Sequence, residues 1–178
     1  MKSYIGLALL GLAVMQVALI GKAGFSGESG PAPYRTLSVG DTVQALSTLG
    51  EGDHRRSLAL VRADGKPTIL LAFNSSCPHC ESIAPMWRDW LQASRPAHVL
   101  AITNDSLSKA HGYRKRHAWN VELVSVAGAE RYSPEHLLVS RVPWVAVFDK
   151  HGVLRLFEHG ESLSKVDSLL GDLVDGTT

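Results

Sequence analysis

Thr68-Ile69-Leu70-Leu71-Ala72-Phe73-Asn74-Ser75-Ser76-Cys77-Pro78-His79-Cys80 is the stretch of sequence that decides the fold. The near-continuous apolar run over residues 69–73 is typical of a strand that is buried on both faces of a sheet. Cys77 and Cys80, the only two cysteines of the chain, follow this run directly. A strand that leads into a Cys-x-x-Cys at the first turn of a helix is the context of a redox motif and not of a disulfide framework. Because a helix N-terminus favours negative charge, we expect Cys77 to be a nucleophilic thiolate near neutral pH.

Zinc binding and a purely structural disulfide are the alternatives for this cysteine pair. A structural zinc site needs about four ligands, and the chain has no second Cys-x-x-Cys and no obvious helical pair among its scattered histidines. A disulfide that closes so short a loop would stabilise the fold little through chain entropy. The sequence therefore favours redox chemistry at Cys77 and Cys80, with no metal and no organic cofactor.

The composition is that of a globular domain with an N-terminal appendage. The 178 residues are 45% hydrophobic, and their net charge of +1 implies no nucleic-acid partner. Residues 5–21 contain no charged side chain, and only Gln16 is polar. This run is at the short end for a membrane-spanning helix and longer than the apolar region of an ordinary signal peptide. We expect residues 1–21 to be an uncleaved membrane anchor, with a cleaved signal peptide as the alternative.

The cysteines indicate the compartment better than the charges that flank the apolar run. Lys2 precedes this run and Lys22 and Arg35 follow it, so the positive-inside rule hardly discriminates. Disulfides form and persist outside the cytoplasm. We therefore expect a single-pass protein of the inner (cytoplasmic) membrane with a periplasmic catalytic domain, or a soluble periplasmic protein if the signal is cleaved.

Strands and helices alternate in the remainder of the chain. Residues 22–36 are rich in Gly, Ser and Pro, as in a flexible linker, and the folded domain is expected over residues 37–178. The patterning predicts strands near residues 58–61, 69–73, 98–102, 121–126, 144–148 and 153–157, and helices over about 77–93 and 106–118 and from residues 133 and 162. Asp149-Lys150-His151-Gly152 should join the last two strands as a hairpin. This order predicts an α/β fold with a mixed central sheet flanked by helices.

The helix that follows Cys77 has an apolar face. Ile83, Trp87, Trp90 and Leu91 recur at helical spacing, which indicates core packing and not a ligand site. Pro85 predicts a kink, because a proline inside a helix removes one hydrogen bond.

The sequence resembles the thioredoxin superfamily over about residues 37–174, in particular its membrane-tethered TlpA/ResA-like branch. The resemblance rests on Phe73-x-x-x-Cys77-Pro78-His79-Cys80, on Pro85 and on Val142-Pro143 before a strand. It implies that Cys77 is the exposed attacking thiolate and Cys80 the less exposed resolving thiol. It also implies that Pro143 is a cis-proline facing the disulfide and that the main chain of Val142 is free to pair with an extended substrate. An ordinary edge-strand proline is the alternative for Pro143.

The sequence departs from the thioredoxin pattern at three places. Leu71 stands where thioredoxins often have a buried carboxylate, so the proton of the resolving thiol must pass through water or another group. Ser75 and Ser76 replace the aromatic residue that often precedes the first cysteine, which should make the site more polar. Pro78-His79 and the Val142 before Pro143 resemble the strongly oxidising DsbA-like enzymes. A positively charged His79 would stabilise the Cys77 thiolate, and hence the reduced form.

The resemblance implies a thiol–disulfide oxidoreductase that acts on extracytoplasmic protein substrates and exchanges electrons with a membrane redox partner. The tether and the hairpin favour a reductant, whereas the Pro78-His79 dipeptide favours an oxidant; we expect a reductant. The alternative is a thioredoxin-like copper or haem-maturation chaperone that uses the thiols as ligands. Copper carriers of this superfamily tend to have three residues between their cysteines, whereas two separate Cys77 from Cys80. A peroxiredoxin is disfavoured because Asn74-Ser75-Ser76 replaces its Pro-x-x-x-Thr before the first cysteine.

Overall fold

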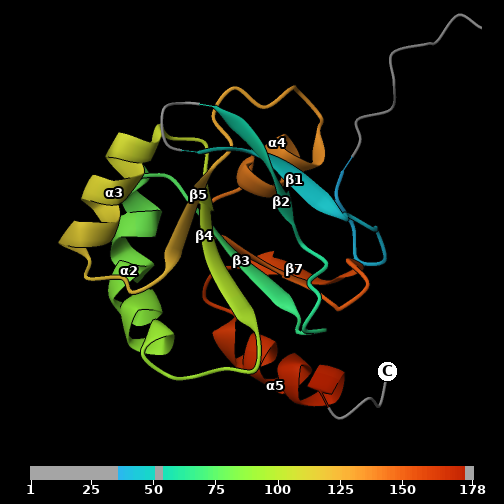
Figure 1. The fold of residues 1–178 in the computed structure, drawn as a ribbon. Helices are drawn as coiled ribbons and strands as arrows, with labels where there is room; N and C mark the ends of the chain where they lie inside the picture. The colour runs from blue at the N-terminus through green and yellow to red at the C-terminus, as the bar shows by residue number, and fades with distance from the viewer. Residues whose placement is uncertain (1–35, 51–53, 175–178) are drawn as a thin grey trace, which may run out of the picture. The chain divides into compact units, whose positions relative to one another are not determined.

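The computed structural model describes residues 36–50 and 54–174, which form a seven-stranded sheet and four helices (Figure 1). The elements, labelled as in Figure 1, are β1 (Ala45–Leu49), β2 (Arg55–Ala59), β3 (Thr68–Phe73), α2 (Pro78–Leu91), β4 (His98–Thr103), α3 (Leu107–Arg116), β5 (Glu122–Ser125), α4 (Pro134–Val139), β6 (Trp144–Phe148), β7 (Leu154–His159) and α5 (Leu163–Val174).

The sheet is mixed, with the strand order β2-β1-β5-β4-β3-β6-β7. β3 and β4 are parallel, as are β4 and β5, whereas all other neighbours are antiparallel. The helices α2 and α3 connect the two parallel pairs, because parallel neighbours need a long crossover connection. The predicted α/β class with a mixed sheet and flanking helices is confirmed.

β3 separates two hydrophobic cores. All six of its residues are buried, and successive side chains point to opposite faces of the sheet. Ile69, Leu71 and Phe73 belong to the core that includes buried residues of α2, α3 and α5. Leu70 and Ala72 belong to the second core, which includes buried residues of α4. Burial on both faces explains the apolar run. The strand ends at Phe73, and the chain then leaves the sheet and begins α2 at Pro78.

α2 follows the predicted helix closely. It begins at Pro78, where a missing backbone N–H costs nothing, and it ends at Leu91. Its buried face includes Ile83, Trp87 and Trp90, as expected from their spacing, and Leu91 packs against the same core. Pro85 lies inside α2, and the helix continues on both sides of it.

The β6–β7 hairpin is confirmed, and Asp149 organises its turn. The Asp149 carboxylate accepts the N–H groups of His151 (2.8 Å) and Val153 (3.0 Å) and the Nε–H of Arg155 (2.7 Å). Gly152 has φ +76°, and a Cβ there would lie 2.6 Å from the Val43 carbonyl oxygen. The turn therefore requires glycine at this position.

The N-terminal half of the sheet differs from the prediction. β1 has no counterpart among the predicted strands, and the strand expected at 58–61 is β2, Arg55–Ala59. β1 and β2 pair antiparallel at one edge of the sheet, with Ala45 opposite Ala59 and Leu49 opposite Arg55. The expected anchor or signal segment, residues 1–21, and residues 22–35 of the linker lie outside the described residues. Within residues 36–50 and 54–174 no helix has the length and apolar character needed to cross a membrane.

Candidate functional site

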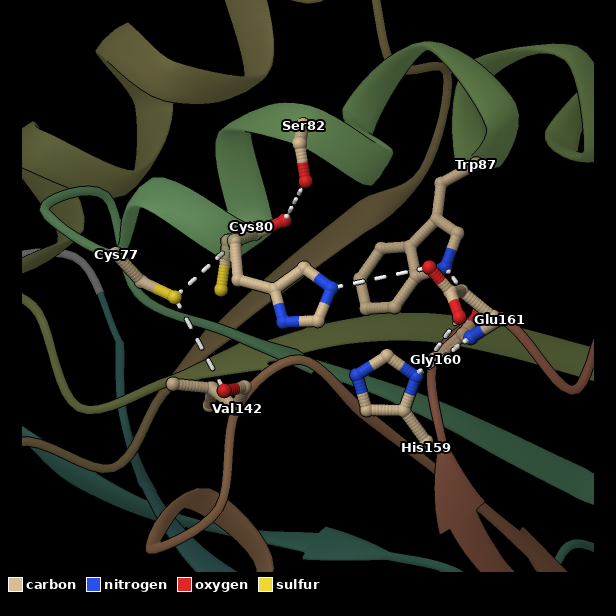
Figure 2. A network of polar contacts seen from close by, with 9 residues as sticks. Cys77, Cys80, Ser82, Trp87, Val142, His159, Gly160 and Glu161 are labelled. Carbon is tan, nitrogen blue, oxygen red and sulfur yellow. Dashed lines mark hydrogen bonds and ion pairs between the residues drawn. The ribbon is translucent and has the colours of Figure 1, made fainter.

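The two cysteines lie at the N-terminus of α2, where the chain leaves β3 (Figure 2). Cys77 is the N-cap residue, and its Sγ accepts the backbone N–H of Cys80 at 3.2 Å. A sulfur in this position receives a donor that would otherwise be unpaired in the first helical turn. The Cys77 sulfur thus faces the N-terminal end of the α2 dipole. Neither cysteine is in a disulfide.

The loop before Cys77 is held by hydrogen bonds to a neighbouring loop. Asp105, which follows β4, accepts the N–H of Ser75 at 2.6 Å and the side-chain amide of Asn74 at 3.2 Å. The Asn74 side chain in turn accepts the N–H of Ser76 at 2.8 Å. Ser75 and Ser76, predicted to make the site polar, thus contribute backbone groups to a fixed turn that orients Cys77.

Cys77 and Cys80 differ in accessibility. Cys77 is half-buried, whereas Cys80 is 1% exposed. Burial raises the pKa of Cys80 to about 12, and its hydrogen bond with Cys77 adds to this shift. Cys80 is therefore a neutral thiol at physiological pH, while Cys77 is the sulfur that a reactant can reach.

The loop before β6 faces Cys77. The Val142–Pro143 peptide bond is cis, and the Cys77 thiol donates to the Val142 carbonyl oxygen at 3.9 Å (Figure 2). Pro143 is buried and Val142 is half-buried. The structure thus places Cys77 at the N-cap of α2 and Pro78, His79 and Cys80 in its first turn, with the Val142–Pro143 loop beside Cys77.

Two further residues near the motif were not identified from the sequence. His159, at the end of β7, has its ring centroid 4.7 Å from that of His79. Glu161 lies 3.8 Å from His79 Nε2 and 3.6 Å from His159 Nδ1. These residues are about eighty positions from His79 in the chain, and no local pattern connects them.

Gly160, between these two residues, fixes their turn against α2. The Trp87 indole N–H donates to the Gly160 carbonyl oxygen at 2.8 Å (Figure 2). The Gly160 N–H donates to the Pro143 carbonyl oxygen at 3.1 Å. A Cβ on Gly160 would lie 2.6 Å from the Trp87 ring. Gly160 directly follows β7, but it lies three residues beyond the strand predicted at 153–157, so the sequence did not indicate this close approach.

The interior near Cys80 is apolar. Leu71 is fully buried in the same core as Cys80. Glu135 and Asp149 are the buried carboxylates of the described residues, and both have other partners. Glu135 accepts the Ser47 N–H, and Asp149 holds the β6–β7 turn. The described residues also contain no cluster of three or more His, Cys, Asp or Glu side chains that could hold a metal ion.

No protein-family model matches the chain. It is 30% identical over 107 residues to the methylamine utilization protein MauD of Methylobacillus flagellatus, covering 56% of this chain and 49% of that protein. It is 28% identical over 174 residues to the protein of the same name from Methylorubrum extorquens, covering 90% and 82% of the two chains. The match thus spans about half the length of the first relative and most of the second.

Solved structures share the fold at low sequence identity. The thioredoxin domain of a thiol-disulfide oxidoreductase from Bacteroides vulgatus superposes with a TM-score of 0.57 at 15% identity, over 76% of this chain and 99% of that one. A peroxiredoxin-like protein from Aquifex aeolicus gives a TM-score of 0.59 at 14% identity, over 76% and 89% of the two chains. These similarities establish a thioredoxin-like fold. One fold can support several activities, so the function must be argued from the site.

Proposed function

Because this chain has a thioredoxin-like fold with Cys77 and Cys80 at the start of α2, we propose that it is a thiol–disulfide oxidoreductase. One observation carries the proposal: the reachable Cys77 sulfur accepts the Cys80 backbone N–H at 3.2 Å and lies next to a buried neutral thiol. The first sulfur is thus arranged to attack, and the second to resolve.

The reaction proceeds through a mixed disulfide. The Cys77 thiolate attacks one sulfur of a substrate disulfide, so a Cys77–substrate bond forms and the other substrate sulfur leaves as a thiolate and takes up a proton. Cys80 then loses its proton and attacks the Cys77 sulfur. This second exchange releases the remaining substrate sulfur, which is protonated. The substrate gains two electrons and two protons, and the Cys77–Cys80 pair is oxidised to a disulfide. In reverse, the same steps oxidise a substrate dithiol.

The high pKa of Cys80 separates the two steps in time. While Cys77 is free, Cys80 keeps its proton because burial and the neighbouring sulfur both disfavour a second negative charge. Attack on the mixed disulfide requires that this proton leave. No buried carboxylate of the described residues adjoins Cys80, so this proton passes to water or to another group.

The site favours a protein substrate in an extended conformation. The proline beside Cys77 is preceded by Val142, whose main chain is next to the reacting sulfur. A disulfide-bearing segment can pair with that main chain as an added strand. We extend the proposal to extracytoplasmic protein substrates, to a membrane redox partner and to an anchor at residues 5–21, since the uncharged N-terminal run and the redox pair are consistent with that location.

We infer that the protein reduces substrate disulfides, as its resemblance to the TlpA/ResA-like branch suggests. A positively charged His79 would favour the opposite direction, because it would stabilise the reduced form and make the disulfide a better oxidant. The reduction potential decides between the two directions.

Trapping of the mixed disulfide tests the proposed mechanism. A Cys80→Ser variant lacks the resolving thiol, so incubation with a disulfide-bonded model protein should leave that protein covalently bound through Cys77. Peptide mass spectrometry after acid quenching identifies the linked cysteine. The matched Cys77→Ser variant retains only the buried thiol and should trap nothing. Equal trapping by both variants, or by neither, would contradict the assignment of roles.

A further inference from the structure

A cavity beside the loop that joins β5 to α4 has no role in the redox steps above. In this part of the protein α4 lies next to β1 (Figure 1). The cavity has a volume of about 410 Å³, which is in the range of pockets that hold small ligands. Residues of β1, β2, the loop and α4 line it, including Ser47, Arg55, Gly128, Glu130 and Glu135.

Glu135 of α4 is a buried carboxylate with only part of its hydrogen bonding satisfied. It is 9% exposed, and its Oε1 accepts the Ser47 N–H at 2.6 Å. Within residues 36–50 and 54–174, its Oε2 has no hydrogen-bond partner and no cation pairs with the carboxylate. Glutamate is rarely buried to this extent unless it is paired, because a carboxylate loses its water on burial. Oε2 is therefore available to a donor that enters the cavity.

Arg55 of β2 brings the opposite charge to the same cavity. Its Nη2 donates to the Gly128 carbonyl oxygen at 2.7 Å, and its Nη1 donates to Ser47 Oγ at 3.5 Å. Gly128 has φ +69°, and a Cβ there would lie 3.3 Å from Arg55 Nη2, so glycine lets the guanidinium approach closely. A guanidinium has more N–H donors than these two bonds use, and no carboxylate of the described residues forms an ion pair with Arg55. The group is thus held in place and still has donors for a ligand.

Ser47 connects the two charged groups. Its backbone N–H donates to Glu135 and its hydroxyl accepts from Arg55, yet Glu135 and Arg55 form no ion pair with each other. We propose that the cavity binds a free α-amino acid, whose ammonium donates to Glu135 Oε2 and whose carboxylate accepts from Arg55. Hydrogen bonds between charged groups of these kinds are stronger than those between neutral groups. Glu130, an exposed residue of the lining, adds negative charge that favours the ammonium.

Both charged ends of the ligand are required for tight binding. L-Alanine has both, ethylammonium has only the ammonium, and propionate has only the carboxylate. Either fragment would leave one protein group without a partner, and loss of one hydrogen bond to a charged group should weaken binding about ten- to hundredfold. L-Alanine is a suitable probe because its side chain is a single methyl group, which demands little further space in the cavity.

Amide NMR of the full-length, ¹⁵N-labelled reduced protein measures binding at constant ionic strength. The Ser47 amide reports on the site directly, because its N–H donates to Glu135. L-Alanine should shift this resonance saturably, and the two fragments should bind about ten- to hundredfold more weakly. Glu135→Gln and Arg55→Gln should each weaken L-alanine binding by a similar factor. Arg56→Gln is the matched control: Arg56 is the next residue of β2 but pairs with Glu122, so binding should be unchanged.

Several outcomes would overturn the proposal. L-Alanine might give no saturable shift, either fragment might bind as tightly as L-alanine, or either Glu135→Gln or Arg55→Gln might bind as the wild type does. An equal loss in Arg56→Gln would also overturn it, because the effect would then follow net charge and not the site. Amide spectra show whether each variant is folded, and if one is not, the comparison of L-alanine with its two fragments on the wild type decides. The cysteines take no part in these measurements, so their result is independent of the proposed function.

Discussion

Replacement of Gly160 by alanine should destabilise the protein, because no space exists for a side chain at this turn. A Cβ at position 160 would lie 2.6 Å from Cζ2 of Trp87 and 2.8 Å from Cδ1 of Ile83. The methyl of Ile83 can rotate away, but the Trp87 ring is 1% exposed and is held by its own hydrogen bond to Gly160. Either the ring or the turn must move.

The expected cost combines two terms. An extra methyl group in a packed site costs about 1–3 kcal/mol. Movement of the turn also weakens the 2.8 Å bond between the Trp87 N–H and the Gly160 carbonyl, and a buried group left without its partner costs about 1–3 kcal/mol. Movement of the turn relieves the steric overlap but weakens the hydrogen bond, so the two costs do not simply add. We expect the free energy of unfolding to fall by about 2–4 kcal/mol in total. With a urea m-value of about 2 kcal/mol per M, the unfolding midpoint should fall by about 1–2 M.

Urea unfolding of the reduced full-length protein, followed by tryptophan fluorescence, measures this change. Gly171→Ala is the matched control, because a Cβ at position 171 in α5 meets nothing within 4 Å. Alanine is favoured over glycine in a helix by about 0.8–1.0 kcal/mol, so the control midpoint should stay the same or rise. A Gly160→Ala midpoint equal to that of the wild type would refute the close packing of this turn against α2.

Further predictions concern two ionisable groups, Cys80 and Asp149. In the folded reduced protein at about pH 8, an alkylating reagent should modify Cys77 and leave Cys80 unmodified, because burial raises the pKa of Cys80 to about 12. Cys80 should react only after urea is added, and peptide mass spectrometry identifies the modified cysteine. Because the unfolded chain releases the Cys80 proton at about pH 8.5, the stability of the reduced protein should fall as the pH rises from there towards 12; a flat profile would contradict the assignment. Asp149→Asn should lower the free energy of unfolding in urea at pH 7 by about 1.5–3 kcal/mol, because the carboxylate loses charged hydrogen bonds. Burial opposes ionisation of Asp149, but hydrogen bonds from the Val153 N–H and Arg155 outweigh this effect and lower the pKa of its carboxyl. That stability is present above about pH 3.9 and is lost as the pH falls through the folded value, so the variant should show a weaker acid dependence than the wild type.

The part of the chain around the cysteines could be predicted well because its signals are local. The apolar run gave β3 within one residue, since burial on both faces leaves no polar position. The helix expected over about 77–93 is α2, which begins at Pro78. The Ser133-Pro134 pair predicted the start of α4, because serine caps a helix and proline is tolerated at its first position.

β1 could not be predicted, and β2 begins three residues before the strand expected at 58–61, because the stability of these strands comes from pairing. β1 contains Ser47 and Thr48. Thr48 is fully buried, and its hydroxyl donates to the Arg56 carbonyl across the strand pair. β2 begins with Arg55 and Arg56, whose exposure suits an edge strand. Neither segment has the apolar alternation that marks a strand in isolation.

His159 and Glu161 were missed for a related reason. Their position beside His79 depends on how the β6–β7 hairpin packs against α2. In the sequence, this contact is marked only by a glycine at position 160, where no side chain would fit. The sequence did show that Leu71 replaces a carboxylate, and the apolar surroundings of Cys80 agree with that interpretation.

Thiol–disulfide exchange by a Cys77→Ser variant tests the central claim most directly. The assay follows reduction of a disulfide-bonded model protein by the wild type and by the variant, with glutathione as the source of electrons. Because Cys80 is 1% exposed and neutral at physiological pH, it cannot replace Cys77 as the attacking group. The account predicts that the wild type accelerates the exchange and that Cys77→Ser abolishes the acceleration. A variant that retained the wild-type rate would contradict it.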